Sequence, residues 1–192
     1  MTKEKIMHYE PFFKLFKKIA ERETRVITFL TNEKIPIGSY AFVPSYCADK
    51  QCDCRRALVS VYEDKKEAYS KQPLATISYG WEDFKFYRDW SGGFEDKMIQ
   101  EFKGPALDSM QPQSQYAPFL LATFIDLIEK DEDYAQRLQR HYAFFKYKKG
   151  MRMPSKLRAL MNPLTPCACQ SGKIFKLCCG KNRSRLRKGK RR

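Results

Sequence analysis

Four of the chain's seven cysteines fall within thirteen positions, in the stretch PCACQSGKIFKLCCG at residues 166–180. This stretch is too polar to bury four thiols in a core of its own. A tetrahedral zinc ion needs ligands that converge from two chain segments, with Zn–S bonds of about 2.3 Å. Two close pairs of cysteines separated by a short loop meet that need, and Gly172 can supply the turn between them. The ligands that this spacing predicts are Cys167, Cys169, Cys178 and Cys179.

Zinc bound in this way would be structural, because four thiolates close the coordination sphere and leave no position for an activated water. Folding of the segment should then depend on the metal. The alternative of a vicinal disulfide between Cys178 and Cys179 would be strained. An odd number of cysteines without an export signal also argues against a disulfide framework and favours metal in a reducing compartment.

The same fifteen residues resemble the SEC-C motif, the zinc-binding element at the C-terminus of the SecA preprotein-translocase ATPase. Besides the four ligands, the matching positions are Ser171, Gly172, Lys173, Phe175 and Lys176. Ala168 and Gln170 depart from the usual motif, but neither is a ligand position. The resemblance implies a zinc-dependent contact module, which in SecA serves protein and ribosome binding, and it specifies no partner here.

A second resemblance covers most of the rest of the chain. The strings YCADKQCDCRRALVSVY, LATISYGW, PQSQYAPFLL and RLQRHYAFF look like the amino-terminal part of uncharacterised SEC-C motif-containing proteins. This resemblance implies no known activity.

A strongly basic tail follows the cysteine motif. The chain has a formal charge of +15, and eight of its basic residues lie in the last twelve positions. Such runs are typically disordered and solvated, and they commonly contact phosphate backbones, although acidic lipid or protein would also attract them. The SecA resemblance favours RNA or the ribosome over DNA. The expected phosphate contacts are Lys173, Lys176, Lys181, Arg183, Arg185, Arg187, Lys188, Lys190, Arg191 and Arg192.

Three further cysteines, Cys47, Cys52 and Cys54, lie in the loop YCADKQCDCRR between two expected strands. Three thiols are one ligand short of a closed zinc site. His141 could complete a second site, because it falls on the inward face of an expected helix, and His8 is a rival ligand. His141 could equally be an ordinary core histidine. A third interpretation is a nucleophilic cysteine, with Arg55 and Arg56 lowering its pKa and His141 acting as base.

Hydrophobic patterning predicts an α+β body at residues 1–150, with a small antiparallel sheet of about four strands. The expected strands begin at Arg25, Ser39, Arg56 and Leu74. The expected helices are Glu10–Glu23, a short one ended by Gly92 and Gly93, Phe94–Phe102, Ser114–Glu129, and one from the Asp131–Asp133 cluster to Gly150. A linker at 151–165 should join this body to the zinc motif at 166–180 and the disordered basic tail at 181–192.

The aromatic segment WEDFKFYRDW could stack bases through Trp81, Phe84, Phe86, Tyr87 and Trp90, but such a stripe is more often core packing. The first residues lack the apolar stretch of a signal peptide, and the run YAPFLLATFIDLI is too short to span a membrane. We therefore expect a soluble cytoplasmic protein.

The chain shows no Gly-rich phosphate loop, no H-E-x-x-H motif and no nucleophile elbow, which argues against an enzyme. The sequence predicts a non-enzymatic zinc protein that docks to an acidic partner, RNA or the ribosome first, through its zinc motif and cationic tail. The alternatives are a protein-protein adaptor in secretion or quality control, and a thiol-dependent enzyme.

Overall fold

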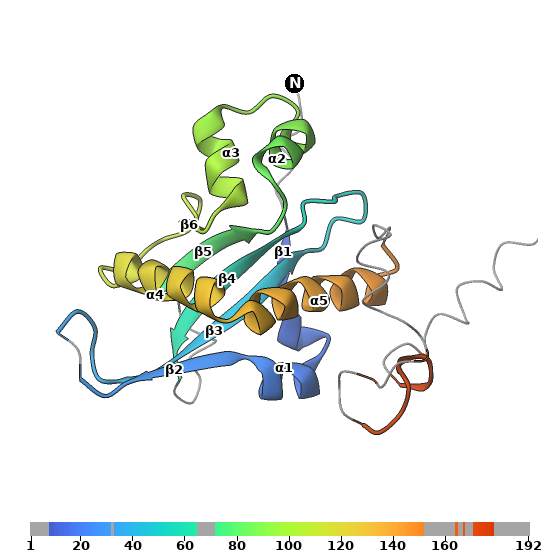
Figure 1. Ribbon diagram of the computed structural model, residues 1–192, viewed down its shortest axis with the longest axis horizontal. Coiled ribbons are helices and arrows are strands. Elements are labelled where there is room, and N and C mark those ends of the chain that lie inside the picture. The colour runs from blue at the N-terminus through green and yellow to red at the C-terminus, as the bar shows by residue number, and fades with distance from the viewer. Residues whose placement is uncertain are drawn as a thin grey trace, which may run out of the picture.

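An antiparallel sheet with helices on one face and at one end forms the body of the protein (Figure 1). The computed structural model describes residues 8–31, 33–64, 72–151, 164, 167 and 171–178, and the structural statements below concern these residues. The strands are β1 (Tyr9–Pro11), β2 (Arg25–Phe29), β3 (Gly38–Cys47), β4 (Arg56–Glu63), β5 (Ala75–Gly80) and β6 (Ala106–Leu107). The helices are α1 (Lys17–Glu23), α2 (Phe84–Ser91), α3 (Asp96–Lys103), α4 (Ala117–Lys130) and α5 (Glu132–Lys148), with 3-10 turns η1 (Phe12–Lys14) and η3 (Phe175–Leu177).

The predicted α+β class is confirmed, and the sheet is somewhat larger than predicted. The four expected strands correspond to β2, β3, β4 and β5, and the short strands β1 and β6 extend the sheet. The strand order is β1-β3-β4-β5-β6, with β2 also paired to β3. Both strands are too short to show the alternation of apolar and polar residues by which a strand is recognised in a sequence.

Strand β3 organises the sheet, because one of its edges pairs with β4 and the other pairs with both β1 and β2. β2 pairs with residues 38–42 of β3, and β1 pairs with residues 45–47. Pro44 falls between these two segments. Its missing N–H therefore interrupts neither of these two ladders, while on the other edge of β3 Pro44 is paired with Val59 of β4.

The predicted first helix is wrong in its first half. Residues Tyr9–Pro11 form an edge strand, residues 12–14 form the 3-10 turn η1, and α1 begins only at Lys17. The apolar side chains whose spacing suggested one helix still reach the core from these separate elements. The rings of Phe12 and Phe16 stack at 4.9 Å, and both are buried. Backbone pairing of Tyr9 and Glu10 with β3 takes the place of helical hydrogen bonds.

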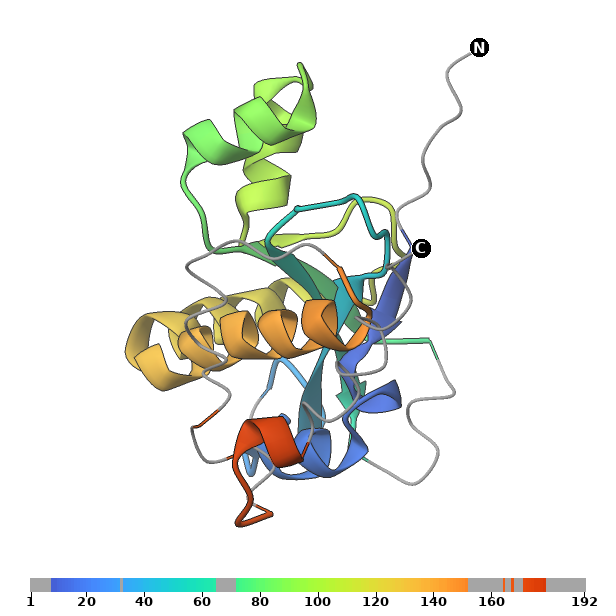
Figure 2. The same cartoon turned by 90° about the vertical axis from the view of Figure 1, so that its right-hand side faces the viewer.

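The main core lies between the sheet and helices α4 and α5, which lie together on one side of it in both views (Figure 1 and Figure 2). The fully buried rings of Tyr46, Phe124 and Phe145 join the sheet to these helices. Asp131 caps α5 by accepting a hydrogen bond from the Tyr134 backbone N–H at 2.9 Å. Acidic residues in the first turn of α5 and lysines in its last turn complement the helix dipole, as the sequence predicts.

Helices α2 and α3 form a separate pair beyond the end of the sheet (Figure 1). Tyr87, Ile99 and Phe102 make a small core of their own there. Gly92 ends α2 in the left-handed conformation, with φ of 71°, as predicted. The aromatic residues between 81 and 90 mostly pack: Tyr87 is fully buried, and Phe84, Phe86 and Trp90 are partly buried against it.

The described part of the cysteine motif packs against the body. The Phe175 ring of η3 is buried and stacks on Phe144 of α5, with centroids 5.5 Å apart, while Tyr147 lies edge-on at 5.3 Å. Apart from Met151 and Leu164, the expected linker lies outside the described residues, as do the tail, Cys169 and Cys179, so the domain boundaries there stay predictions. Among the described helices, none combines the length and apolar character required to cross a membrane.

Candidate metal centre

Cys47, Cys52 and Cys54 come together at the connection between β3 and β4. Cys47 is the last residue of β3, and Cys54 lies two residues before β4 begins. Their three sulfur atoms lie within 4.8 Å of one another. Tetrahedral bonds of about 2.3 Å to zinc place sulfur atoms about 3.8 Å apart, so only a small contraction would be needed. Cys47 and Cys54 are fully buried, and Cys52 is partly exposed.

Backbone hydrogen bonds fix the loop that carries these thiols. The Ala48 N–H donates to the His8 carbonyl at 2.8 Å, which ties the start of the loop to the chain entering β1. Asp49 then forms a turn: its side chain accepts from the Gln51 N–H at 2.9 Å, and its carbonyl accepts from the Cys52 N–H at 3.3 Å. This is the local side-chain bonding that makes aspartate common in turns. The turn returns the chain so that Cys52 faces Cys47.

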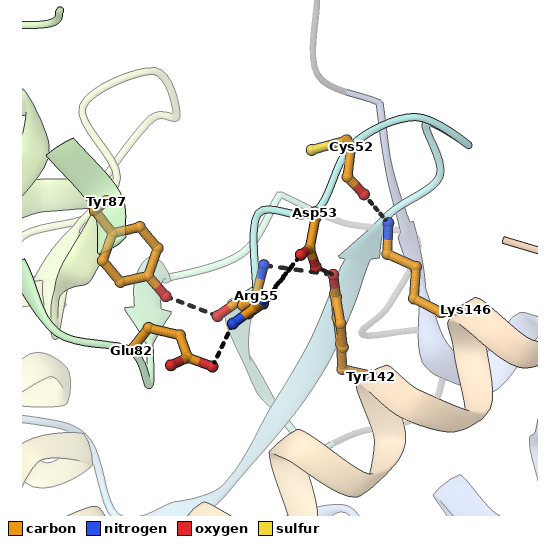
Figure 3. A network of polar contacts seen from close by, with 7 residues as sticks. All are labelled: Cys52, Asp53, Arg55, Glu82, Tyr87, Tyr142 and Lys146. Atoms are coloured by element: carbon orange, nitrogen blue, oxygen red, sulfur yellow. Dashed lines mark hydrogen bonds and ion pairs between the residues drawn. The ribbon is translucent and has the colours of Figure 1, made fainter. Parts of the chain in front are cut away.

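Helix α5 holds the other side of the loop through two residues one turn apart (Figure 3). The Tyr142 hydroxyl donates to Asp53 Oδ1 at 3.3 Å and accepts from the Arg55 N–H at 3.4 Å. Lys146 Nζ donates to the Cys52 carbonyl at 2.7 Å. The loop therefore keeps its shape through side chains that come from a distant part of the sequence.

Arg55 has φ of 45°, in the left-handed region that residues other than glycine rarely occupy. Its guanidinium donates to Asp53 at 2.9 Å and to Glu82 at 3.1 Å, and its carbonyl accepts from the Tyr87 hydroxyl at 2.8 Å (Figure 3). The guanidinium also lies 4.4 Å from the centre of the Phe86 ring. A costly backbone conformation persists only where its surroundings over-determine it, and such positions gather at functional sites.

The three thiols do not share one protonation behaviour. Hydrogen bonds from Cys52 and Cys54 outweigh the effect of burial and lower the pKa of Cys47 to about 3. Hydrogen bonding to Cys47 and burial raise the pKa of Cys54 well above its ordinary value. Without metal, the thiolate form is thus favoured at Cys47 and the thiol form at Cys52 and Cys54. A metal cation would take the place of the shared protons.

Tyr9 borders the site on the side of β1. Its hydroxyl lies 3.8 Å from Cys54 Sγ, and burial raises the pKa of the phenol well above its ordinary value. A neutral phenol can donate a hydrogen bond to a sulfur ligand. The short strand β1, which the sequence did not reveal, therefore supplies part of the wall of the site.

The structure does not bring His141 to the three cysteines, contrary to the expectation that it completes their site. Its Nε2 lies 2.8 Å from Glu23 Oε2, and its ring stacks on Phe12 with centroids 4.1 Å apart. Successive residues of a helix lie about 100° apart around its axis. Because Tyr142 and Lys146 face the cysteine loop, the neighbouring His141 points in a different direction. His141 is 2% exposed, which fits the alternative of a core histidine.

The rival ligand His8 is not part of the group either. Its side chain is 74% exposed, and its Nδ1 lies 3.7 Å from Glu10 Oε1. What the sequence reasoning missed is the pair of α5 residues, Tyr142 and Lys146, that contact the loop. Their spacing of four residues marks one helix face, but only the structure shows which loop that face meets.

In the C-terminal motif, Cys167 and Cys178 are the two predicted ligands among the described residues. The Cys167 N–H donates to the Lys173 carbonyl at 2.8 Å, and the Ser171 hydroxyl donates to Cys178 Sγ at 3.1 Å. Gly172 has φ of 70°, as a tight turn between the two ligand pairs requires. Cys169 and Cys179 lie outside the described residues, so the set of four ligands stays a prediction.

Of the predicted phosphate contacts, Lys173 and Lys176 are described, and both are exposed. The eight basic residues at 181–192 lie outside the described part of the chain. No family model, no curated protein and no solved structure matches this chain. The likeness of residues 166–180 to the SEC-C motif accordingly stays a resemblance carried by fifteen residues.

Proposed function

We propose that this chain is a non-enzymatic zinc-binding protein whose body holds one ion through Cys47, Cys52 and Cys54. The observation that carries this proposal is the convergence of three sulfur atoms within 4.8 Å in a loop fixed from two sides. Thiolates are the ligands that structural zinc sites use most, and neither oxygen-preferring calcium nor magnesium would select them. The ion would join the β3–β4 connection into one unit.

A second zinc ion belongs to the C-terminal motif in this proposal, bound by Cys167, Cys169, Cys178 and Cys179. The turn at Gly172 and the hydrogen bond from Ser171 to Cys178 support a compact arrangement of this segment. Because Phe175 packs on α5, the ion would hold a surface element against the body rather than a detached tip.

The partner that we propose is a polyanion, with RNA or the ribosome as its class. The support is the net charge of +15, with eight basic residues in the last twelve positions, and the exposure of Lys173 and Lys176 beside the zinc motif. Lysine and arginine contacts to phosphates give affinity without reading sequence. Binding that stays constant as salt is raised would instead favour a protein-protein adaptor.

Alkylation of Cys52 tests the metal site in the body. Cys52 is the partly exposed member of the group, so it reports on access to the sulfur atoms. We expect Cys52 to resist iodoacetamide in the zinc-loaded protein and to react after chelation, as read by peptide mass mapping. Equal reaction in both states would contradict zinc binding there and would make the three thiols candidates for thiol chemistry.

A further inference from the structure

Lys146 is a charged side chain in the interior, next to the three cysteines. It is 0% exposed, although it lies in the last turn of α5. Its Nζ donates to the carbonyl of Cys52 at 2.7 Å (Figure 3). It also donates to the carbonyl of Asp49 at 3.5 Å and lies 5.3 Å from the centre of the Tyr142 ring. These contacts give the ammonium two carbonyl acceptors and one aromatic face, and none of them supplies a negative charge.

A buried ammonium needs a nearby anion, because removing an unpaired charge from water costs several kcal/mol even after relaxation. The ion pairs formed among the described residues include Lys149 with Glu10, but none involves Lys146. In the loop that Lys146 contacts, the carboxylate of Asp53 already pairs with Arg55, and that of Asp49 accepts a hydrogen bond from the Gln51 N–H. The cysteine sulfur atoms of this loop are therefore the candidates for the counter-charge.

The charge of the complex depends on the ion. Three thiolates around a divalent ion carry a net charge of −1, which one ammonium cancels. Three thiolates around trivalent arsenic carry no net charge, which would leave the ammonium without a partner. A fourth anionic ligand on a divalent ion would leave one negative charge unmatched in the interior.

We propose that Lys146 is the counter-charge of the site formed by Cys47, Cys52 and Cys54, and that it selects a divalent ion with three thiolates and a neutral fourth ligand. The inference rests on the proposed metal site in the body and specifies the ion's charge class. The fourth ligand is then a water or the Tyr9 phenol, whose oxygen lies 3.8 Å from Cys54 Sγ. Lys146 is a positioning residue here, since it acts on the ion through the ligands.

Two thiophilic species with different charges test this selection. Cd²⁺ stands in for zinc and displaces the protons that remain on the three sulfur atoms, which gives a complex of charge −1. Arsenous acid binds the same three sulfur atoms with release of three waters, taking up one proton for a sulfur that is already a thiolate, which gives a neutral complex. Both are titrated into the full-length chain with Cys167, Cys169, Cys178 and Cys179 replaced by serine, so that only the site in the body is read.

We expect Lys146→Met to weaken Cd²⁺ binding by about 10- to 100-fold, the usual effect of losing a partner that supports metal ligands. Its affinity for arsenous acid should stay the same or rise. Lys148→Met is the matched control: it removes the same charge from the same helix at an exposed position, and it should change neither affinity.

The ratio of the two affinities is measured within each variant, which separates selection from a general loss of folding. An unchanged ratio in a Lys146→Met chain that still binds both species overturns the inference. If that variant binds neither species, Lys146→Arg decides, because it restores the charge: the inference requires its ratio to match that of the parent. A parent chain that binds neither species overturns the proposed metal site itself, and the inference with it.

Discussion

At the scale of single residues, the buried pair of His141 and Glu23 joins α5 to the end of α1. The Nδ1 atom of His141 is buried and has no hydrogen-bond partner among the described residues, while Nε2 lies 2.8 Å from Glu23. A neutral imidazole that donates through Nε2 satisfies this environment, whereas a charged one would bury an unpaired N–H at Nδ1. Burial lowers the pKa of His141, in agreement with the neutral form.

This pair predicts a loss of stability in acid. Unfolded His141 gains a proton as the pH falls below its ordinary pKa of 6.5, while the folded residue resists it, so the free energy of unfolding declines. Burial raises the pKa of Glu23, but hydrogen bonds from His141 and Arg140 outweigh this and lower the pKa to about 2. The contribution of ionised Glu23 to the free energy of unfolding therefore disappears as the pH falls from about 4.5 towards 2.

Urea unfolding at pH 7.5, 6.5, 5.5 and 4.5 measures the first of these effects. His141→Gln keeps a donor for Glu23 but cannot take up a proton, so its stability should vary less than that of the parent between pH 6.5 and 5. Identical pH slopes for the two proteins would show that His141 is not held neutral.

The cysteines of the candidate site could be predicted from their spacing, but the side chains around them could not. C-x4-C-x-C places three thiols in one loop whatever the rest of the fold does. Lys146 gives no such signal, because a lysine in the last turn of a helix usually faces solvent. Its burial depends on how α5 lies against the β3–β4 loop, which is a property of the tertiary structure.

At the scale of elements, η3 is a short turn held to α5 by one aromatic residue. Phe175 is 4% exposed and belongs to the main core, while its neighbour Leu177 is 53% exposed. Three residues of 3-10 helix do not hold their shape alone. The packing of Phe175 on Phe144 therefore provides much of what orders this turn.

Phe175→Ala should release the turn from α5 without unfolding the body. Full removal of a buried phenylalanine costs about 3 to 5 kcal/mol, more than so small an element can sustain. Hydrogen exchange at the amides of Leu177 and Cys178, which donate to the carbonyls of Ile174 and Phe175, should become fast.

Leu177→Ala is the control, because it removes a similar side chain from the exposed side of the same turn. It should leave the exchange rates at these amides nearly unchanged. Retained slow exchange in Phe175→Ala would mean that something other than packing on α5 orders the turn.

The elements differ in how far the sequence determines them. Asp131 and Gly92 mark real helix ends, because capping chemistry acts within a few residues. The first helix was misplaced because Phe12, Phe16 and Ile19 have helical spacing, yet Tyr9 and Glu10 find hydrogen-bond partners on the edge of β3. Pairing such as that of Tyr9 with Cys47, 38 positions apart in the sequence, is invisible to a local pattern.

At the scale of the whole molecule, charge is the dominant feature. Deleting residues 181–192 would remove eight basic residues and lower the formal charge from +15 to +7. Each phosphate contact adds about 0.7 to the slope of log affinity against log salt for single strands, so the slope should fall by up to about 6. The loss should be similar for all RNA sequences.

Fluorescence anisotropy with two unrelated RNA oligonucleotides, over a series of salt concentrations, checks this. The control is the zinc content of the truncated protein, which should equal that of the full chain because the deletion spares all seven cysteines. RNA affinity and salt slope that survive the deletion would remove the tail from the proposed interface and favour the adaptor.

Native mass spectrometry of the folded chain counts its zinc ions and so tests for a metal centre in the body. We expect two ions in the full chain. We expect one when Cys47, Cys52 and Cys54 are replaced by serine, one when the four C-terminal cysteines are replaced, and still two in His141→Gln. A full chain that holds a single ion, and keeps it after Cys47, Cys52 and Cys54 are replaced, would contradict a metal centre in the body.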